Sequence, residues 1–333
     1  MSYPCAKPVP SPRSHPVGLW RRGAENHLRS VTTHLVTGAQ GYVGRYLTRE
    51  LLNRRAEATV IGVGRSAHDG ELLDRYVYEP ADILDVPRMR AVLERYRPER
   101  VFHLAAAPRH GSRAEIAHTN VLGTVSLLDA IIGIDGYRPR VVIGSSGGVY
   151  GALDDDQLPA SESATCIPVD IHGASKLAAE HMARIAGERH GVCVMAARIF
   201  NVCGPGQDAQ HVCGRIAAQL RPGEGEIRVG NLGATRDFID VRDVATALAV
   251  IAERGACGEA YNVSSGDEMP ISGLLDRMIR ISGFSGVVAP DDAPPAPGVP
   301  RHYGDVTRLR ELGFVQRHRI EDSLRDLITE QWR

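Results

Sequence analysis

The sequence predicts an α/β protein built on a doubly wound parallel sheet, followed by a smaller C-terminal lobe. Two observations carry this prediction. Apolar segments of strand length alternate with amphipathic segments of helix length over the first two thirds of the 333 residues, an order typical of a parallel sheet with helices on both faces. Beyond Phe200 the alternation weakens and glycine and proline cluster, which indicates a lobe at the carboxyl ends of the strands.

The expected elements follow one another without an internal repeat. Strands are predicted at 34–37, 58–63, 100–105, 139–144 and 192–198, and helices at 44–55, 86–96, 114–132 and 175–190. They predict a sheet domain over 32–200, rejoined by segments at about 237–265, and a second lobe over 201–333. Repeated prolines break any regular element in residues 1–31, where we expect a disordered leader.

Composition excludes several classes of protein. The net charge of −1 gives no overall field that would attract nucleic acid or an anionic membrane surface. The longest apolar runs are far shorter than the roughly 20 residues of a membrane helix, so no membrane contact is expected. We interpret the six scattered cysteines as reduced thiols of a cytoplasmic protein, and no group of residues predicts a metal site.

The turn between the first strand and the first helix has the glycine spacing of a dinucleotide-binding loop. Gly38 permits the sharp turn, Gly41 lets the backbone approach a pyrophosphate, and Gly44 permits close packing of helix on strand. The start of the helix offers free N–H groups to phosphate. The predicted cofactor contacts here are Gly38, Gly41, Tyr42, Val43 and Gly44. They make the sheet domain a Rossmann-type domain that binds NAD(P).

The end of the second strand bears on the choice between NAD and NADP. An acidic side chain at this place would bind the ribose hydroxyls of NAD, but the strand ends on Gly64 and Arg65. Because a guanidinium pairs well with phosphate, Arg65 favours the 2′-phosphate of NADP, with NAD possible. The alternative is that Arg65 is an exposed surface arginine without a role in binding.

Later motifs extend this pattern to about residue 327. They are His103-Leu-Ala-Ala106, Ser145-Ser-Gly-Gly-Val-Tyr150, Arg198-Ile-Phe-Asn201 and Arg236-Asp-Phe238. With the glycine turn, these motifs resemble those of the extended short-chain dehydrogenase/reductase family of sugar-nucleotide enzymes. The sequences of these motifs resemble most those of the GDP-4-keto-6-deoxy-D-mannose reductases of that family.

The resemblance implies roles for individual residues. It implies cofactor contacts at Asp82, Ile83, Leu104, Ala105, Ala106, Asn120 and Lys176, an active-site serine at Ser146, and nucleotide-sugar contacts at Asn201 and Arg236. Arg236 would bind the diphosphate. The resemblance also implies a homodimer, joined through a four-helix bundle formed by the helices at 114–132 and 175–190.

The catalytic motif departs from the family. The family carries Tyr-x-x-x-Lys, in which the tyrosine transfers the proton on the reacting oxygen, whereas this chain has His172-Gly-Ala-Ser-Lys176. Residues four apart share a helix face, so His172 is expected at the tyrosine's place. An imidazole with its ordinary pKa near 6.5 would titrate near neutral pH, and Lys176 would favour its neutral form. The alternatives are lost catalysis or a reassigned acid, such as Ser146 or a substrate hydroxyl.

Two further departures narrow the chemistry. Gly147 and Gly148 stand where dehydratase relatives carry Asp-Glu, so dehydration and decarboxylation are not expected. Ala296 stands where the family often has an arginine that contacts the diphosphate. A substrate with a different nucleotide, or with none, is therefore an open alternative. Arg109 and His110 follow the third predicted strand and are further candidates to face the substrate.

These residues together predict an NAD(P)-dependent oxidoreductase acting on a nucleotide-linked sugar. The expected reaction is 4-keto reduction or epimerisation through a transient keto intermediate, with His172 at the tyrosine position. Two alternatives stay open. One is a non-catalytic dinucleotide-binding homologue, and the other is an enzyme of a non-nucleotide sugar, cyclitol or nucleoside.

Overall fold

The computed structural model describes residues 32–68, 73–221, 223, 225–290 and 299–329. The leader predicted at 1–31 and the departure at Ala296 lie outside the described residues. Over those ranges, no helix is both long and apolar enough to cross a membrane.

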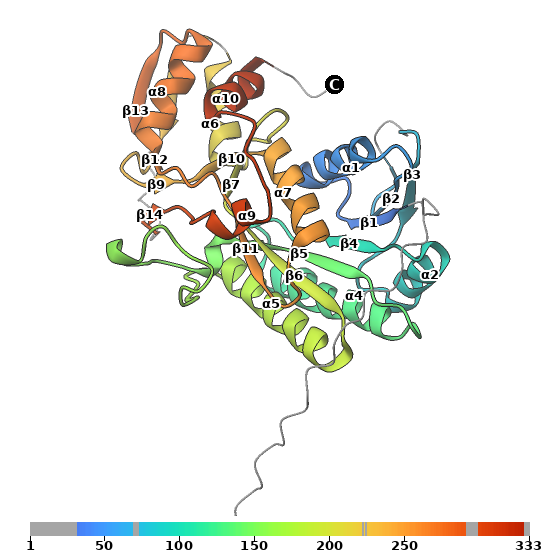
Figure 1. Cartoon of the computed structure of the whole chain (residues 1–333). Coiled ribbons are helices and arrows are strands. Elements are labelled where there is room, and N and C mark those ends of the chain that lie inside the picture. Colours follow the sequence, from blue (N-terminus) through green and yellow to red (C-terminus); the bar gives the residue numbers. More distant parts are fainter. Residues whose placement is uncertain (1–31, 69–72, 222, 224, 291–298, 330–333) are drawn as a thin grey trace, which may run out of the picture. The chain divides into compact units, whose positions relative to one another are not determined.

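A parallel sheet of seven strands lies at the centre of the described chain, in the order β11-β6-β5-β4-β1-β2-β3 (Figure 1). The strands are β1 (Thr33–Thr37), β2 (Thr59–Gly64), β3 (Tyr76–Pro80), β4 (Arg100–His103), β5 (Arg140–Ser146), β6 (Cys193–Ile199) and β11 (Ala260–Val263). The chain leaves β1 toward β2 on one side and reaches β4 on the other, so the carboxyl ends of β1 and β4 border the point where the winding reverses. Ligands bind at such a point in open sheets. The predicted doubly wound fold is confirmed.

Helices cover both faces of the sheet (Figure 1). The helices are α1 (Tyr42–Arg54), α2 (Val86–Tyr96), α3 (Arg113–Ala117), η1 (His118–Leu122), α4 (Gly123–Ile132), η2 (Gly147–Val149), η3 (Asp155–Gln157), α5 (Ile171–His190), α6 (Val212–Leu220), α7 (Val241–Arg254), α8 (Ile271–Ser282), α9 (Thr307–Glu311) and α10 (Ile320–Thr329). One apolar core forms between the sheet and helices α1 and α7. A second core forms on the opposite face, against α2, α4 and α5.

A third apolar core belongs to the C-terminal part of the chain, where α6, α8 and α10 pack together with short strands. These strands are β7 (Asn201–Cys203), β8 (Glu226–Val229), β9 (Thr235–Arg236), β10 (Phe238–Asp240), β12 (Met269–Pro270), β13 (Val287–Pro290) and β14 (Arg301–His302). Two of the small sheets matter for the site, because β7 pairs with β10 and β9 lies between β12 and β14. These pairings involve four separate segments of the chain, at 201–203, 235–240, 269–270 and 301–302.

Three helices differ from their predicted bounds, and the first of them, expected at 44–55, runs from Tyr42 to Arg54. The helix expected at 114–132 begins at Arg113 and contains a π-helical turn at His118–Leu122. The helix expected at 175–190 begins four residues earlier, at Ile171, because the Asp170 carboxylate accepts a hydrogen bond from the Gly173 amide and caps the helix. His172 and Lys176 therefore both lie inside α5.

A disulfide joins Cys193, at the start of β6, to Cys257, with a Cα–Cα distance of 4.8 Å. The expectation of six reduced thiols is therefore wrong for this pair. The two cysteines are 64 residues apart in sequence, and only the pairing of β11 with β6 brings them together.

Candidate active site

The glycine turn lies directly against the end of β4. Gly38 has a φ of +68°, the left-handed region that favours glycine. A Cβ there would lie 2.8 Å from the Ala105 nitrogen. A Cβ on Gly44 would lie 2.2 Å from the Gly38 oxygen, so Gly44 serves the turn itself rather than helix–strand packing.

The start of α1 is open to a ligand. Gly41 is exposed, and a Cβ there would meet only the Gly38 oxygen, at 3.1 Å. The first turn, which holds Tyr42 and Val43, carries no acidic residue, and no side chain caps it. Helix N-termini with free N–H groups bind phosphates, so the turn fits the pyrophosphate of a dinucleotide.

Hydrogen bonds between polar side chains stabilise the end of β4 next to the glycine turn. The buried His103 ring bonds to Thr37 Oγ1 at 2.9 Å and to Thr124 Oγ1 at 3.0 Å. Burial, and then the charge of Lys176, lower the pKa of His103 to about 3. The ring is therefore neutral. Its hydrogen bonds fix the strand ends where Leu104 and Ala105 contact the glycine turn.

Asn120 joins three segments around the expected nicotinamide position. It lies on the π-helical turn, its Oδ1 accepts from the Ala107 amide at 2.9 Å, and its Nδ2 donates to Ser175 Oγ at 2.9 Å. The π-helical turn thus connects the loop after β4 to α5. Ile83 packs nearby, against Gly123, whereas Asp82 and Ala106 are exposed.

The end of β2 carries no acidic side chain at residue 64. The Tyr78 hydroxyl occupies the space beside Gly64: it would lie 2.5 Å from a Cβ there, and its oxygen lies 2.8 Å from both Gln40 Oε1 and the Ser66 oxygen. An acidic residue that binds the ribose of NAD at this position would need the Tyr78 side chain to move. Arg65 follows directly and is exposed.

The candidate catalytic residues meet where β5 ends against the first turn of α5. Lys176 Nζ donates to the Gly144 oxygen at 2.7 Å. Ser146 Oγ accepts from the Gly148 amide at 3.1 Å. A Cβ on Gly173 would lie 2.5 Å from the Gly148 oxygen, so the helix turn bearing His172 touches the segment that follows Ser146.

The surroundings of this site lower the pKa of both of its bases, His172 and Lys176. Burial, and then Lys176 and Arg109, lower the pKa of His172 to about 4. Burial lowers the pKa of Lys176 to about 8, against the opposing charge of Glu180. Burial and Lys176 both favour the neutral imidazole, as the sequence predicts, and burial places the pKa of His172 below the near-neutral range that the sequence predicts.

The two predicted substrate residues lie side by side in the C-terminal part. Asn201, on β7, donates from its Nδ2 to the Asp237 oxygen at 3.1 Å, next to Arg236 on β9. The Arg236 guanidinium donates to two backbone oxygens, those of Thr235 and Pro300. Over the described ranges it has no carboxylate partner, although burial and Arg109 lower its pKa. A half-buried cation in this state suits an anionic ligand.

His302 is a residue of this site that sequence reasoning missed. It lies beside Arg236 in the register of β14 with β9. Its Nε2 lies 3.0 Å from the Gly147 oxygen, and its ring stacks on Phe200 with centroids 4.7 Å apart. A Cβ on Gly147 would lie 2.8 Å from His302 Cε1. The space of the dehydratase acid is therefore filled by this imidazole.

Arg109 reaches the same site from the loop after β4. Its guanidinium forms an ion pair with Asp170, the residue that caps α5. Its charge lowers the pKa of His172, of Arg236 and of His302, which indicates that it lies close to all three. His110 is exposed. Among the described residues, no three metal-ligating side chains gather closely enough to hold an ion.

Comparison with known proteins gives the class of the molecule. Residues 34–264 match the model of the NAD dependent epimerase/dehydratase family. The chain belongs to this family, and with it to the extended short-chain dehydrogenases/reductases, which are enzymes.

Individual relatives span nearly the whole chain. The GDP-6-deoxy-D-mannose reductase of Pseudomonas aeruginosa is 31% identical over 307 residues, which cover 89% of this chain and 95% of that protein. The structure of RMD from Pseudomonas aeruginosa complexed with NADPH is 29% identical, with a TM-score of 0.76 over 90% of this chain and 98% of that one. The UDP-glucose 4-epimerase of Thermotoga maritima with UDP-glucose is 26% identical, with a TM-score of 0.79 over 89% and 97% of the two chains.

Proposed function

We propose that this protein is an NAD(P)-dependent oxidoreductase of a nucleotide-linked sugar, which reduces a 4-keto group or epimerises through a keto intermediate. The observation that carries the proposal is the meeting of Ser146, His172 and Lys176 at the end of β5, between the glycine turn and Arg236. The related reductase and epimerase act on GDP- and UDP-linked sugars.

The cofactor is NADP, with NAD possible. The glycine turn leaves Gly41 open above a helix N-terminus without a capping side chain, and Gly64 provides no ribose-binding acid. The exposed Arg65 is the residue we assign to the 2′-phosphate. The related RMD structure is complexed with NADPH.

The chain's own residues bind and polarise the reacting oxygen. Because Ser146 Oγ accepts from Gly148, its hydroxyl proton remains to be donated to a substrate carbonyl. The neutral His172 donates a second hydrogen bond, and the nearby charge of Lys176 stabilises the negative charge that develops on the oxygen. When bound, the nicotinamide would supply or accept the hydride. The charged Lys176, acting through the hydrogen-bonding Ser146 hydroxyl or His172 imidazole, would supply or accept the accompanying proton.

The substrate's diphosphate fits the cationic side of the site. Arg236 has no acidic partner in the described chain, and Asn201 lies next to it. Glycines follow Ser146, and His302 fills the space beside Gly147, so no acid is in place to expel water from the sugar. Reduction and epimerisation are therefore favoured over dehydration.

The proposal includes a homodimer joined through a four-helix bundle. Apolar side chains along α5 and the adjoining π-helical turn are 41–50% exposed: Leu122, Ile171, Met182 and Ile185. Contact with the same surface of a second copy would bury them. Light scattering should give twice the chain mass, and replacing Met182 and Ile185 together by glutamate should give the monomer. A parent monomer at micromolar concentration would contradict the dimer.

A spectrophotometric assay tests the activity. We expect NADPH oxidation at 340 nm with GDP-4-keto-6-deoxy-D-mannose, with parallel assays on 4-keto sugars linked to UDP and dTDP. Interconversion of UDP-hexoses in the presence of NAD, without net cofactor turnover, would establish the epimerase instead. Binding of NADPH without turnover of any of these substrates would favour the second candidate, a non-catalytic homologue, which the histidine at position 172 motivates.

A further inference from the structure

The segment that carries Ser146 is held at both of its ends by one buried ion pair. At its start, the Ser145 hydroxyl donates to the Glu180 carboxylate. At its end, Arg198 Nη1 donates to the Tyr150 hydroxyl at 3.0 Å, and that hydroxyl donates to Asn262 Oδ1 at 2.7 Å. Glu180 and Arg198 bind each other, so both ends of the segment depend on the same pair.

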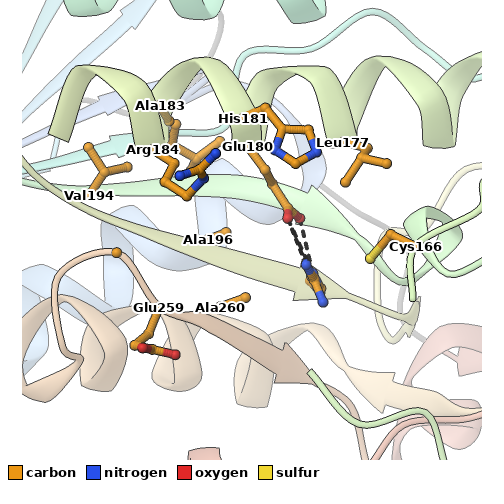
Figure 2. Close-up of a pocket in the computed structure, with 13 residues that line it drawn as sticks. Cys166, Leu177, Glu180, His181, Ala183, Arg184, Val194, Ala196, Glu259 and Ala260 are labelled. Carbon is orange, nitrogen blue, oxygen red and sulfur yellow. Dashed lines mark hydrogen bonds and ion pairs between the residues drawn. The ribbon is translucent and has the colours of Figure 1, made fainter. Parts of the chain in front are cut away.

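The pair has the geometry of a strong contact. Arg198 Nη2 lies 2.9 Å from Glu180 Oε2, and Arg198 Nε lies 3.2 and 3.3 Å from the two carboxylate oxygens. Each side chain is 9% exposed. In Figure 2 the labelled Glu180 points from its helix toward the sheet, where dashed lines mark these contacts. The guanidinium also lies over the Tyr150 ring, 5.0 Å from its centroid.

The spacing on α5 connects this pair to the candidate catalytic lysine. Lys176 and Glu180 are one helical turn apart, and they bind consecutive residues of β5, the Gly144 oxygen and the Ser145 hydroxyl. The helix is thereby fixed to the strand immediately before Ser146. A shift of either anchor would move Ser146 relative to Lys176.

Stability alone is a poor reason for such a pair. Burying two charges costs about as much free energy as their attraction returns, and apolar replacements of similar volume are often neutral or stabilising. The pair also borders a cavity of about 340 Å³, lined by residues such as Cys166, Leu177, His181 and Glu259 (Figure 2). The side chains around the pair are therefore not close-packed, so on this side the segment is held by the hydrogen bonds of the pair, whereas its later residues are also packed in an apolar cluster.

We propose that Glu180 and Arg198 are positioning residues, which fix the Ser146 segment in register with Lys176 without touching the substrate. This inference rests on the proposed function for its kinetic consequence but not for its structural one. Glu180 has a second effect on the same lysine. Its charge opposes the desolvation that lowers the pKa of Lys176, while the other titratable groups close to that lysine, His103 and His172, are neutral.

The test uses the full chain and two variants of different severity. Ser145→Ala removes one tether and leaves the ion pair, whereas Glu180→Gln removes the charge that both tethers share. Glu188→Gln is the matched control, because it is the same substitution in an exposed ion pair with Arg184, farther along the same helix. Each protein is measured for amide exchange of the peptide spanning 145–150, for NADPH affinity, and for kcat and KM with GDP-4-keto-6-deoxy-D-mannose.

We expect Ser145→Ala to exchange faster in that peptide alone and to lower kcat by roughly 10- to 100-fold, the effect of misplacing a reacting group. NADPH affinity and KM should stay at parental values, because binding does not need the tether. Ser145→Thr, which keeps the hydroxyl, should restore kcat. Glu180→Gln should show the larger exchange effect and also move the basic limb of the pH profile to lower pH. Glu188→Gln should match the parent.

Two results would overturn the proposal. One is parental exchange at 145–150 in both variants. The other is a uniform loss of kcat, NADPH affinity and melting temperature, which would make the pair merely structural. A parent that does not turn over any nucleotide-linked sugar would contradict the proposed function, but the exchange measurement would still decide the positioning role.

Discussion

Two neighbouring regions at the carboxyl ends of the strands are specified in different ways. One is the cofactor turn, residues 38–44, and the other is the catalytic corner, which contains Ser146, His172 and His302. The turn is defined by backbone. Side chains at Gly38 and Gly44 would clash with main-chain atoms of the turn and of the segment that follows β4. The corner is assembled from single side chains on separate segments, among them Ser146, His172 and His302. A backbone-defined site tolerates few changes, whereas a side-chain site changes its chemistry one residue at a time.

The largest effect is expected in the corner, at His172. Replacing His172 by Phe should lower kcat by roughly 10²–10⁴-fold, the usual contribution of a positioned acid, base or hydrogen-bond donor. NADPH affinity should change little, because the main contacts proposed for the cofactor, the glycine turn and Arg65, do not involve His172. Steady-state kinetics with a fluorescence titration of NADPH make the comparison. Parental kcat in both His172→Phe and His172→Tyr would mean that another group moves the proton.

The pH profile sharpens the same contrast. The pKa of His172 is about 4 and that of Lys176 about 8, so the histidine is neutral and the lysine charged between those values. We expect kcat to be flat from roughly pH 5 to 7 and to fall above pH 8, as Lys176 loses its proton. In His172→Tyr the basic limb should remain. An inflection near pH 6.5 in the parent would show that His172 is not desolvated in the working enzyme.

The matching change in the turn is Gly41→Val. A side chain there would occupy the space expected for the pyrophosphate, yet its Cβ would meet only one backbone oxygen, so the fold should survive. Loss of one or two charge-assisted hydrogen bonds predicts roughly 100-fold weaker NADPH binding. Calorimetry measures the affinity, and thermal unfolding confirms the fold. Gly233→Val is the control, since Gly233 has no neighbour within 4 Å and lies outside the turn. Undiminished binding by a folded Gly41→Val protein would refute the cofactor assignment.

The same difference explains what the sequence could predict. The turn and the bounds of α2 follow from local signals, in the second case the Asp85 cap and the left-handed Arg97 at the helix end. The start of α5 was placed too late, because its cap, Asp170, precedes the apolar pattern. His302 carried no local signal. It lies on a two-residue strand after many prolines, and only the pairing of that strand with β9 brings it to Gly147.

A smaller effect is expected on the substrate side. Arg236→Ala should raise KM for a nucleotide-linked sugar by roughly 10- to 100-fold and leave kcat nearly unchanged, because a contact made equally in ground and transition states is lost. Asn201 and the Asp237 network next to it should keep the site folded. Initial-rate kinetics against substrate concentration separate the two constants. An unchanged KM would indicate a substrate without a diphosphate, as in the alternative of a free sugar, cyclitol or nucleoside.

The smallest effect is expected for Arg65, because here a side chain, rather than backbone, distinguishes NADPH from NADH. Arg65 is exposed, so solvent screens its charge, and its contact with a 2′-phosphate is worth about 1 kcal/mol or slightly more. Arg65→Ala should therefore weaken NADPH binding about five- to ten-fold and leave NADH binding unchanged.

The control for a general loss of positive charge is Arg215→Ala, which replaces an exposed arginine of α6. Titrations at low and high salt add a second criterion, because a screened ion contact shrinks with salt whereas the contacts of the glycine turn do not. Equal loss of NADPH and NADH affinity would mean that Arg65 contacts a part common to both cofactors. No loss for either would mean that Arg65 does not contact the cofactor, and the assignment of NADP would then rest on the missing acid at Gly64 alone.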